Sequence, residues 1–588
     1  MKIFENFKFN TKHQLIILII LAFCLNVNTL FNEYALDDSI IFTNNSFVTK
    51  GVHGIPEILT TDLMKGTSVG AKELTQPRYR PFSQIIFAIE YQFFGTNPMV
   101  SHLINLLLFI FLIALLFKLL NSFIFQQQHK YLAFITCLLF VVHPIHTEVI
   151  ANVKSRDELI TFLLLIISLI QFIKYAELKK ITFLLFGLLC FFIALLTRES
   201  AITFVGIVPL VLYFFFNKTF IKSLVFSIPL AIVTILYLAL RFSIVGFKYT
   251  VTDVLIAPFL YASPTQAFAT KVLILIKYIG LLISPFPLSW EYGYNQIPYI
   301  DINSIPFILS SLLIITLLFY AVYTFKKRDL LSFSIMYFFV TISLVCNILV
   351  DIGTPLSERL LFQPSLAFCM VVAFIYLKAN EKAKYLTNFI FIIILIVFSL
   401  KTILRNAEWK NDESIYFTDV NSTPNSIRTN MTVASEYNFK TNTETNIELR
   451  KEYFKKSIFY SSQALKIKSN NPRSQMDLLY SYHGLLNCYP AADFFLQDNL
   501  SNLSTPEGKI ILNILSDELY KNGNGFIEQG NIANAIESYS NCLKLNKTHT
   551  QAWYNLGGCY YSIKDTINAN RSWAELKKLD PNFIINKK

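Results

Sequence analysis

The stretch VSHLINLLLFIFLIALLFKLLNS, residues 100–122, decides the fold class of this chain. Apart from Lys118 it has no permanent charge, and it is as long as the roughly 20 residues that an α-helix needs to cross a membrane. Of the 588 residues, 54% are hydrophobic and only 15% are charged, whereas about 25% are charged in soluble proteins. This composition excludes an ordinary soluble enzyme and predicts an α-helical membrane protein.

Similar apolar runs fill the first 404 residues, at 14–31, 131–148, 158–175, 181–196, 201–216, 221–241, 267–285, 303–324, 330–350, 360–378 and 386–404. Positive residues between spans stay on the cytoplasmic side. This rule places the N-terminus in the cytoplasm, with the first run as a signal anchor rather than a removed signal peptide. Between Arg241 and Lys326 the chain has one apolar run too many for both positive segments to lie in the cytoplasm. The weakest run there, 267–285, contains Lys271 and Lys277. We therefore expect that run to lie at the interface or to re-enter, which leaves about eleven spans.

A repeat of 34 residues, the length of a tetratricopeptide helix-turn-helix unit, begins at Ser516. Its second copy has Trp553, Leu556, Gly557, Tyr560, Ala569, Trp573 and Pro581; in the first copy Leu519, Gly523, Phe526, Ala535 and Tyr539 each precede one of these by 34 positions. The small residues let two helices approach closely while the aromatic residues fill the space between them. Each unit buries its face only against neighbours, so we expect three or more units.

These patterns predict a membrane domain at 1–404 with an external loop at 32–82, a linker at 405–425 and a tetratricopeptide α-solenoid at 426–588. The clear repeats are 516–549 and 550–583. The formal charge of +12 does not indicate a nucleic-acid partner, because Lys and Arg are scattered in short clusters between apolar runs. The eight Cys show no CxxC spacing, so neither a zinc site nor a disulfide framework is indicated.

Five polar segments fall on the non-cytoplasmic side in this topology, at 32–80, 143–156, 197–199, 289–301 and 351–359. Convergence on one face is what a single active site at one membrane surface would produce. The first segment contains the adjacent acids Asp37 and Asp38 directly after the first span. Such acids can serve as a general base and as a charge anchor or metal ligand. The alternative is a solvated turn or helix cap.

The polar motifs follow a fixed order, which is Asp37-Asp38, Tyr79-Arg80-Pro81, Gly95-x-Asn97-Pro98, His102-x-x-Asn105, His143-Pro144-Ile145-His146-Thr147-Glu148, Asn152-Val153-x-x-Arg156-x-Glu158-Leu159, Arg198-Glu199 and Glu358-Arg359 before Pro364-Ser365. In this order the chain resembles the transmembrane and tetratricopeptide-repeat-containing O-mannosyltransferases over nearly its whole length. It departs from the animal members in its short repeat array, and residues 421–515 match the repeat pattern poorly.

The resemblance implies a C-type glycosyltransferase fold, with a polytopic helix bundle that precedes the solenoid. It also implies transfer of a sugar, mannose by the family, from a polyprenyl-phosphate carrier to a protein Ser or Thr hydroxyl outside the cytoplasm. The base that activates the hydroxyl would be Asp37 or Asp38. The partners would be this lipid-linked donor, membrane lipid, and an acceptor protein or peptide that the repeats bind. No cofactor is certain, and a divalent metal is possible.

A lipid-phosphate leaving group needs cationic partners, and guanidinium binds phosphate bidentately. The candidates are Arg80, Arg156, Arg198 and Arg359, each of which could instead anchor a helix end. Supporting roles are assigned to Tyr79, His102, His143, His146, Glu148, Glu199 and Glu358. The histidines could bind phosphate, shuttle protons or bind metal, and Glu148 could support a histidine or pair with Arg156.

The usage of Asn, Lys, Ile and Phe looks bacterial, which favours an inner-membrane protein with its repeats in the periplasm. An endoplasmic-reticulum protein with luminal repeats is the alternative. Two other functions stay open. One is an oligosaccharide ligase or polymerase that uses a diphosphate-linked glycan, and the other is a non-catalytic membrane scaffold that binds partners through its repeats.

Overall fold

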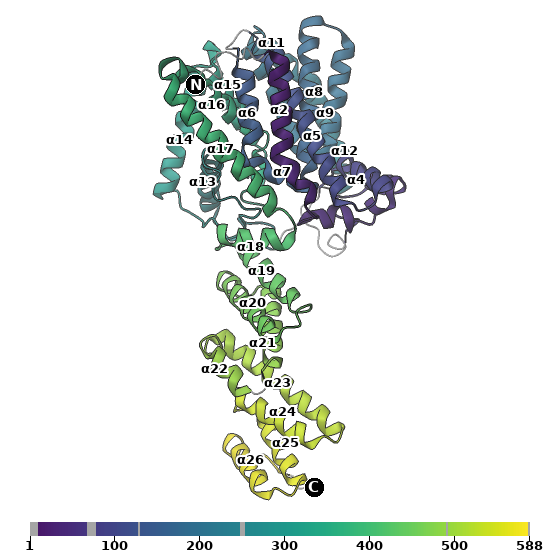
Figure 1. Ribbon diagram of the computed structural model, residues 1–588, viewed down its shortest axis with the longest axis vertical. Helices are drawn as coiled ribbons and strands as arrows, with labels where there is room; N and C mark the ends of the chain where they lie inside the picture. Colours follow the sequence, from purple (N-terminus) through teal and green to yellow (C-terminus); the bar gives the residue numbers. More distant parts are fainter. Residues whose placement is uncertain (1–9, 68–77, 127–129, 247–252, 490–491, 586–588) are drawn as a thin grey trace. The chain divides into compact units, whose positions relative to one another are not determined.

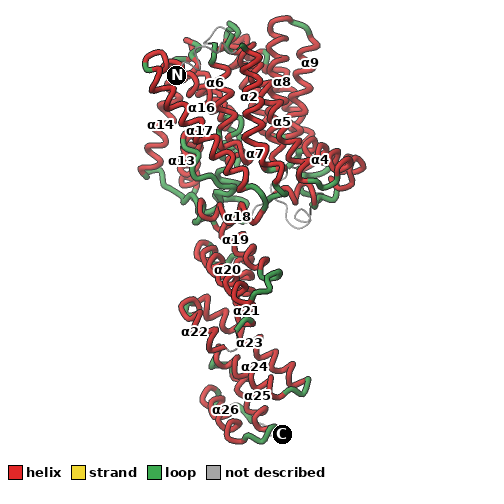
Figure 2. The backbone as a smooth tube through the Cα atoms, in the orientation of Figure 1, coloured by secondary structure: helices red, strands yellow, loops and turns green. Residues whose placement is uncertain are grey.

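The computed structural model describes residues 10–67, 78–126, 130–246, 253–489 and 492–585, and every regular element in these ranges is a helix (Figure 2). The chain divides into two compact units, Met1–Arg428 and Thr429–Lys588. Residues 68–77 of the predicted external loop and the last three of the predicted repeat domain lie outside the described residues. The all-helical fold class is therefore confirmed for the described chain.

The helices of the first unit are α2 (Thr11–Asn26), η1 (Val27–Phe31), η2 (Ser39–Thr43), η3 (Val48–Gly54), α3 (Ile55–Thr60), α4 (Pro81–Phe94), α5 (Pro98–Leu119), η4 (Leu120–Ile124), α6 (Leu132–Val142), η5 (Pro144–His146), α7 (Thr147–Ala151), η6 (Val153–Ser155), α8 (Arg156–Leu178), α9 (Ile181–Thr197), η7 (Glu199–Thr203), α10 (Phe204–Phe215), α11 (Phe220–Val225), α12 (Ser227–Val245), α13 (Pro264–Ile283), α14 (Ile305–Tyr323), η8 (Phe325–Lys327), α15 (Leu330–Ile342), η9 (Glu358–Leu361), α16 (Ser365–Lys382), α17 (Lys384–Glu408) and α18 (Asp412–Ser422). Helix α19 (Ile427–Lys440) crosses the division between the units. Within the first unit, α2 packs on α5 and α6, α5 on α8, and α8 on α9 (Figure 1).

Among the described residues, seven helices are long and apolar enough to cross a membrane, at Thr11–Phe31, Pro98–Ile124, Val153–Leu178, Phe220–Val245, Pro264–Ile283, Ile305–Tyr323 and Lys384–Glu408. An eighth span is possible if α6 and the bent segment Pro144–Ala151, which meet at 57°, count as one. Three further apolar helices, Ile181–Thr197, Glu199–Phe215 and Leu330–Ile342, are shorter. The protein is an integral membrane protein, but the spans differ from those we predicted.

Two corrections follow for the spans. The run 267–285, which we had set aside, forms α13 and passes the same test of length and composition as the other long helices. Several runs that we counted as full spans are short or broken. The run 131–148 breaks before Pro144, whose ring cannot continue the helix, and α15 ends at Ile342 instead of continuing to residue 350.

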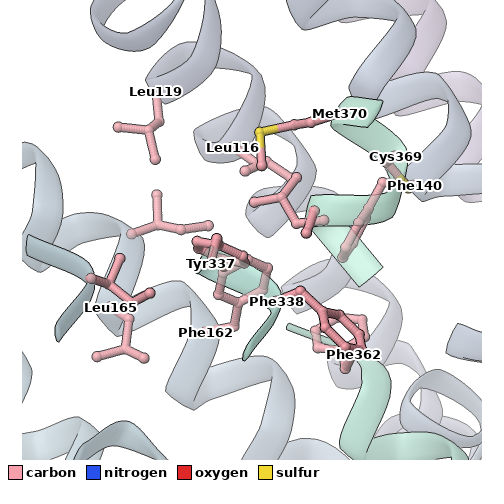
Figure 3. Packing of buried hydrophobic residues seen from close by; sticks show 14 of the residues in the cluster. Leu116, Leu119, Phe140, Phe162, Leu165, Tyr337, Phe338, Phe362, Cys369 and Met370 are labelled. Atoms are coloured by element: carbon pink, nitrogen blue, oxygen red, sulfur yellow. The ribbon is translucent and has the colours of Figure 1, made fainter. Parts of the chain in front are cut away.

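The core of the first unit includes aromatic and aliphatic side chains from α5, α6, α8, α15 and α16 (Figure 3). The Phe140 and Phe162 rings lie 5.5 Å and 5.8 Å from the Phe362 ring, at the angles that aromatic pairs prefer. By contrast, only 11% of the apolar window of α14 and of α17 is buried. These two helices therefore have faces left for lipid.

The predicted linker at 405–425 is part of the first unit. Arg405 at the end of α17 forms a buried ion pair with Asp419 of α18, at 2.6 Å. Trp409 and Ile415 are also buried. This segment is a packed helical element, not a flexible connection.

The second unit contains α20 (Ile447–Ile467), α21 (Pro472–Asn487), α22 (Ala492–Leu503), α23 (Pro506–Glu528), α24 (Ile532–Leu545), α25 (Thr550–Ser562) and α26 (Thr566–Leu579). Helix α23 packs on α24, and α25 on α26. A Cβ added to Gly523 would lie 2.5 Å from the Tyr539 ring, and one added to Gly557 would lie 2.3 Å from the Trp573 ring. The predicted close approach of small and aromatic residues is confirmed in both copies, whereas the tetratricopeptide solenoid as a whole stays a prediction.

Candidate active site

The polar segments that we predicted to converge do meet at one end of the bundle. Ion pairs and hydrogen bonds join them, from Asp37 to Lys154, from Arg80 to Glu199, from Arg359 to Glu148, and from Ser289 to Glu358. The breaks in the bundle are at this end, because α7, η6, η7 and η9 are short helices that carry Glu148, Lys154, Glu199, Glu358 and Arg359. The irregular backbone places charged side chains from distant parts of the sequence next to one another.

Asp38 is a buried anchor. Its carboxylate accepts three backbone N–H bonds, from Ala35 at 3.1 Å, from Val153 at 3.2 Å and from Lys154 at 2.6 Å. The side chain is inaccessible to solvent. Burial raises the pKa of Asp38 to about 7, although the three backbone hydrogen bonds act in the opposite direction. This residue fastens the external segment to η6, directly before α8, and offers no free oxygen to a substrate.

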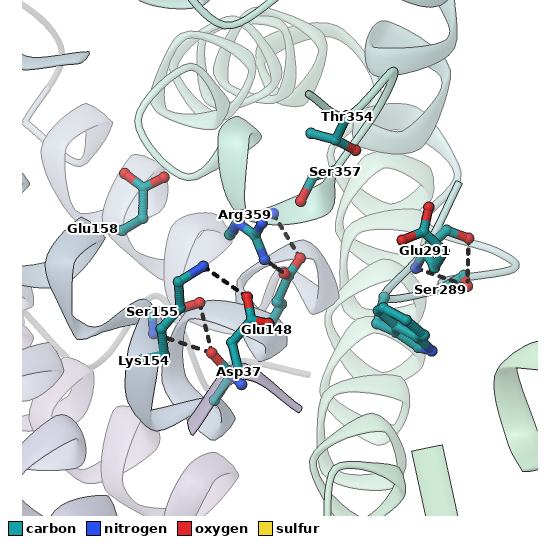
Figure 4. Close-up of polar contacts among 12 residues, drawn as sticks. Asp37, Glu148, Lys154, Ser155, Glu158, Ser289, Glu291, Thr354, Ser357 and Arg359 are labelled. Carbon is teal, nitrogen blue, oxygen red and sulfur yellow. Dashed lines mark hydrogen bonds and ion pairs between the residues drawn. The ribbon is translucent and has the colours of Figure 1, made fainter. Parts of the chain in front are cut away.

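Asp37 has the opposite environment. The preceding residue, Leu36, has a φ of 56°, a left-handed conformation that is rare for a non-glycine residue and marks strain. The Asp37 side chain is 50% exposed, and its Oδ2 lies 3.1 Å from the Lys154 Nζ, which is only 6% exposed (Figure 4). The structure therefore separates the two neighbouring acids into one accessible carboxylate and one enclosed carboxylate.

Cations hold Asp37 in its ionised form. Lys154 lowers the pKa of Asp37 most, and Arg359 and Arg78 add to this effect, while burial opposes it. The net result is a pKa well below the usual range. Asp37 is consequently a carboxylate at every pH near neutrality.

Arg359 lies beside Asp37 and is oriented by Glu148. The two Glu148 oxygens accept from the Arg359 backbone N–H at 2.9 Å and from Nη1 at 2.7 Å. Glu148 is buried, whereas 23% of the Arg359 side chain is exposed. We had expected Glu148 to support a histidine or to pair with Arg156, and both expectations are wrong, because η9 brings Arg359 to it instead.

Arg80 and Arg198 are bound to acids. Asp157 accepts from both guanidinium groups, at 2.8 Å and 2.9 Å. Glu199 accepts from Arg80 at 2.9 Å, and Glu158 from Arg198 at 3.0 Å. The Arg80 side chain is only 11% exposed and the Arg198 side chain only 6%. These two candidates for phosphate binding are thus already neutralised by three carboxylates.

Arg156 is enclosed inside the protein. Its guanidinium pairs with Glu90 of α4, donates to Asn105 Oδ1 of α5 at 2.6 Å and to the Ser101 carbonyl at 2.9 Å, and lies 4.8 Å from the centre of the Phe87 ring. Only 1% of it is exposed. The arrangement ties α4, α5 and α8 together and leaves no access for a lipid phosphate.

The histidines and Tyr79 also have structural partners. His102 forms a hydrogen bond with the Glu33 carbonyl at 3.1 Å, and His143 forms one with the Leu282 carbonyl at 2.9 Å. His146 bonds both the Phe140 carbonyl and Ser365 Oγ, each at 2.8 Å. The Tyr79 hydroxyl donates to the Leu59 carbonyl at 2.9 Å. All four side chains are buried. In the described part of the chain, no three His, Cys, Asp or Glu residues are grouped to hold a metal ion. Because these side chains are buried and bonded to the protein, they do not fit a divalent metal.

Glu358 lies in a second polar cluster, with Ser289 and Tyr292. Its Oε1 accepts from the Tyr292 hydroxyl at 2.8 Å and from the Ser289 N–H, whereas Oε2 is buried without a hydrogen-bond partner among the described residues. Burial raises the pKa of Glu358 to about 8. Glu358 therefore fastens the 289–292 loop to η9.

No protein-family model matches this chain. Curated relatives do match it. The protein O-mannosyl-transferase F38B6.6 of Caenorhabditis elegans is 26% identical over 425 residues, which cover 70% of this chain and 58% of the relative. The protein O-mannosyl-transferase TMTC3 is 24% identical in Mus musculus, over 97% of this chain and 64% of the relative, and 23% identical in Homo sapiens, over 94% and 63%.

The chain is similar to proteins named protein O-mannosyl-transferases. Low identity extends over nearly the whole chain, through both structural units. The chain spans about 58% to 64% of the length of these relatives. The family resemblance deduced from the motifs is confirmed.

Two residues at the site were not among our predicted site residues. Lys154, inside the Asn152-to-Leu159 motif, carries the ammonium that pairs with Asp37. Arg78 lies directly before the Tyr79-Arg80-Pro81 motif and contributes to the field at Asp37. Their positions in or beside quoted motifs were the signal in the sequence, because nothing local distinguishes a cation that faces an acid from a helix anchor.

Proposed function

We propose that this protein is a membrane glycosyltransferase that moves a sugar, mannose by the names of its relatives, from a polyprenyl-phosphate carrier to a protein Ser or Thr hydroxyl on the non-cytoplasmic side. The observation that carries this proposal is the half-exposed, ionised Asp37 carboxylate beside Lys154 and Arg359, at one end of an apolar helix bundle. The site brings together a base and cations at a membrane boundary, and that combination suits a lipid-phosphate donor.

Asp37 has the role of base in this reaction. A hydroxyl is a poor nucleophile at neutral pH and needs a positioned acceptor for its proton as it attacks. The acceptor oxygen forms a bond to the anomeric carbon, the carbon–oxygen bond to phosphate breaks, and its electron pair leaves with the polyprenyl phosphate. The hydroxyl proton goes to the Asp37 carboxylate. One carboxylate is enough for such a single displacement, which inverts the anomeric configuration.

The polyprenyl chain would lie in membrane lipid along the outside of the bundle. The apolar cavity between α5, α8, α10, α15 and α16 has a volume of about 50 Å³. A cavity that holds a benzene ring measures about 150 Å³. This cavity is therefore too small for a branched isoprenoid chain.

The acceptor would bind to the second unit. Helical repeats stack into extended surfaces, and such surfaces commonly bind peptides. The positive residues of the sequence favour a cytoplasmic N-terminus, which supports the periplasm or the endoplasmic-reticulum lumen as the compartment of Asp37.

The test is sugar transfer by the purified full chain in lipid nanodiscs, with radiolabelled polyprenyl-phosphate mannose and a pool of Ser- and Thr-rich peptides. We expect Asp37→Asn to lose at least about 100-fold in turnover while the thermal transition stays near that of the wild type. Glu57→Gln is the matched control, because Glu57 is an acid of the same external region, is 38% exposed, and pairs only with Lys50.

Other outcomes would replace the proposal. Transfer from a diphosphate-linked glycan alone would indicate a ligase or polymerase. Loss of transfer in Asp38→Asn but not in Asp37→Asn would make Asp38 the base. No transfer from either kind of donor, together with capture of a partner by the second unit, would indicate the scaffold.

A further inference from the structure

A second cavity lies at the end of the bundle opposite to the candidate active site. It is formed where α6 and α15 begin and α16 ends, and its volume is about 330 Å³. The other ends of α6 and α16 are at the active site, because α6 ends before His143 and α16 starts after η9. Small-molecule sites have volumes of about 300–1,000 Å³, so this cavity has room for a small polar group.

The lining of this cavity combines apolar side chains with charges of both signs. Its apolar part includes the buried residues Leu132, Leu330 and Leu377. Its charged part consists of two cations and two acids, which are Arg328, Lys378, Asp329 and Glu381. Equal numbers of positive and negative side chains suit a ligand that itself carries both charges.

Both cations are oriented by neutral groups. Arg328 has a φ of 54°, in the left-handed region, at the turn between η8 and α15. Its Nη1 donates to Asn217 Oδ1 and its Nη2 to the Lys218 carbonyl, each at 2.8 Å. The Lys378 Nζ lies 4.4 Å from the centre of the Phe374 ring, which also lines the cavity. These contacts position the two cations without neutralising them.

The acids are placed at the level of the lipid headgroups. Asp329 Oδ2 accepts from the hydroxyl of Tyr320, near the end of α14, at 2.7 Å. Tyr side chains and Lys are typical of the membrane–water boundary, and only 11% of the apolar window of α14 is buried. Within the described ranges, no ion pair joins any of the four charged side chains of the cavity to another residue.

We propose that this cavity binds the headgroup of an ethanolamine phospholipid from the surrounding membrane. The phosphate would be bound by Arg328 and Lys378, since charge-assisted hydrogen bonds to phosphate are strong. The primary ammonium would donate its N–H groups to the carboxylates of Asp329 and Glu381. A choline headgroup has no N–H to donate, and a glycerol headgroup has no positive charge for the two acids. The acyl chains would lie along the exposed apolar face of α14, which packs on α15.

The test measures lipid binding to the purified full chain in detergent. The probes are dioctanoyl phosphatidylethanolamine, phosphatidylcholine and phosphatidylglycerol, together with free phosphoethanolamine. We expect the wild type to bind the ethanolamine lipid about tenfold or more tightly than the other two lipids. Glu381→Gln should reduce the preference for ethanolamine over choline. Lys378→Gln should weaken both of these lipids alike, because both carry the phosphate.

Both substitutions are at exposed positions near the end of α16, so the fold should be retained. The matched controls are Lys382→Gln and Glu177→Gln, since both residues are exposed at helix ends on the same side of the bundle and do not line the cavity. Equal affinity for the three lipids, or wild-type affinities in both Lys378→Gln and Glu381→Gln, would overturn the proposal. Free phosphoethanolamine that binds as tightly as the lipid would overturn a membrane lipid as the occupant. Binding is measured without catalysis, so this inference does not depend on the proposed function.

Discussion

Replacing Lys154 by Met should move the acid side of the pH–rate profile toward neutral pH. Lys154 makes the largest contribution to the lowered pKa of Asp37, and the two charged groups are 3.1 Å apart. In the wild type Asp37 is ionised throughout the neutral range, so its titration should not limit the rate there. Without the ammonium, burial raises the pKa of Asp37, and protonation should inactivate the base at a higher pH.

The magnitude follows from the geometry. Two unit charges at that separation interact by about 1.3 kcal/mol in a water-like medium and by about 5 kcal/mol at the effective dielectric constant of a protein surface. Since half of the Asp37 side chain is exposed, the smaller value applies. It corresponds to a rise of about one pKa unit. The backbone N–H of residue 154 still donates to Asp38, so the substitution leaves that anchor intact.

The assay is kcat/KM for sugar transfer from neutral pH down to the acid limit at which the protein stays folded, measured for the wild type, Lys154→Met and Lys50→Met. The control should keep the wild-type profile, because the Lys50 side chain is 49% exposed and pairs only with Glu57. An unchanged profile in Lys154→Met, when Asp37→Asn has lost transfer, would refute the conclusion that Lys154 sets the charge of Asp37.

Three further predictions concern stability. Burial raises the pKa of Glu358 to about 8. The protonated acid therefore stabilises the fold below its unfolded pKa, and this contribution is lost as pH rises toward 8. Thermal melts should show Glu358→Gln to be more stable than the wild type above about pH 8. Gly557→Ala should destabilise the second unit by about 1–3 kcal/mol in chemical denaturation, because its Cβ would lie 2.3 Å from Trp573. Gly558→Ala is the control, and it should be neutral or slightly stabilising because its Cβ would meet no atom within 4 Å. Arg156→Gln should destabilise the first unit by about 3–5 kcal/mol, because it leaves the buried Glu90 carboxylate without its ion-pair partner. The effect should appear as a lower melting temperature in nanodiscs. A loss of donor affinity without this destabilisation would contradict the structural role of Arg156.

The site was only partly predictable from the sequence. The motifs identified the segments that meet, and Arg359 acts on the accessible acid, Asp37, although Glu148 pairs with it. The same reasoning treated Arg80, Arg156 and Arg198 as equal to it, although Asp157, Glu158, Glu199 and Glu90 neutralise them. A residue type indicates which ligand a side chain can bind, but the pairing that removes it from use depends on contacts between distant segments.

The local and periodic properties of the chain follow from its sequence alone. The apolar runs require a membrane-embedded helix bundle, because their length and composition match the hydrocarbon core. The 34-residue spacing fixes the close contacts of Gly523 with Tyr539 and of Gly557 with Trp573, since both members of each pair lie within one helical hairpin.

Which of the two adjacent acids is accessible depends on the tertiary structure. Asp37 and Asp38 are chemically identical and neighbours in sequence, yet one is 50% exposed and the other is buried. The difference arises because the backbone at 153–154 supplies N–H donors to Asp38 while the Lys154 side chain meets Asp37. Those residues are more than 100 positions away in the chain, so no local pattern contains the information; the packing of η6 against the external segment creates it.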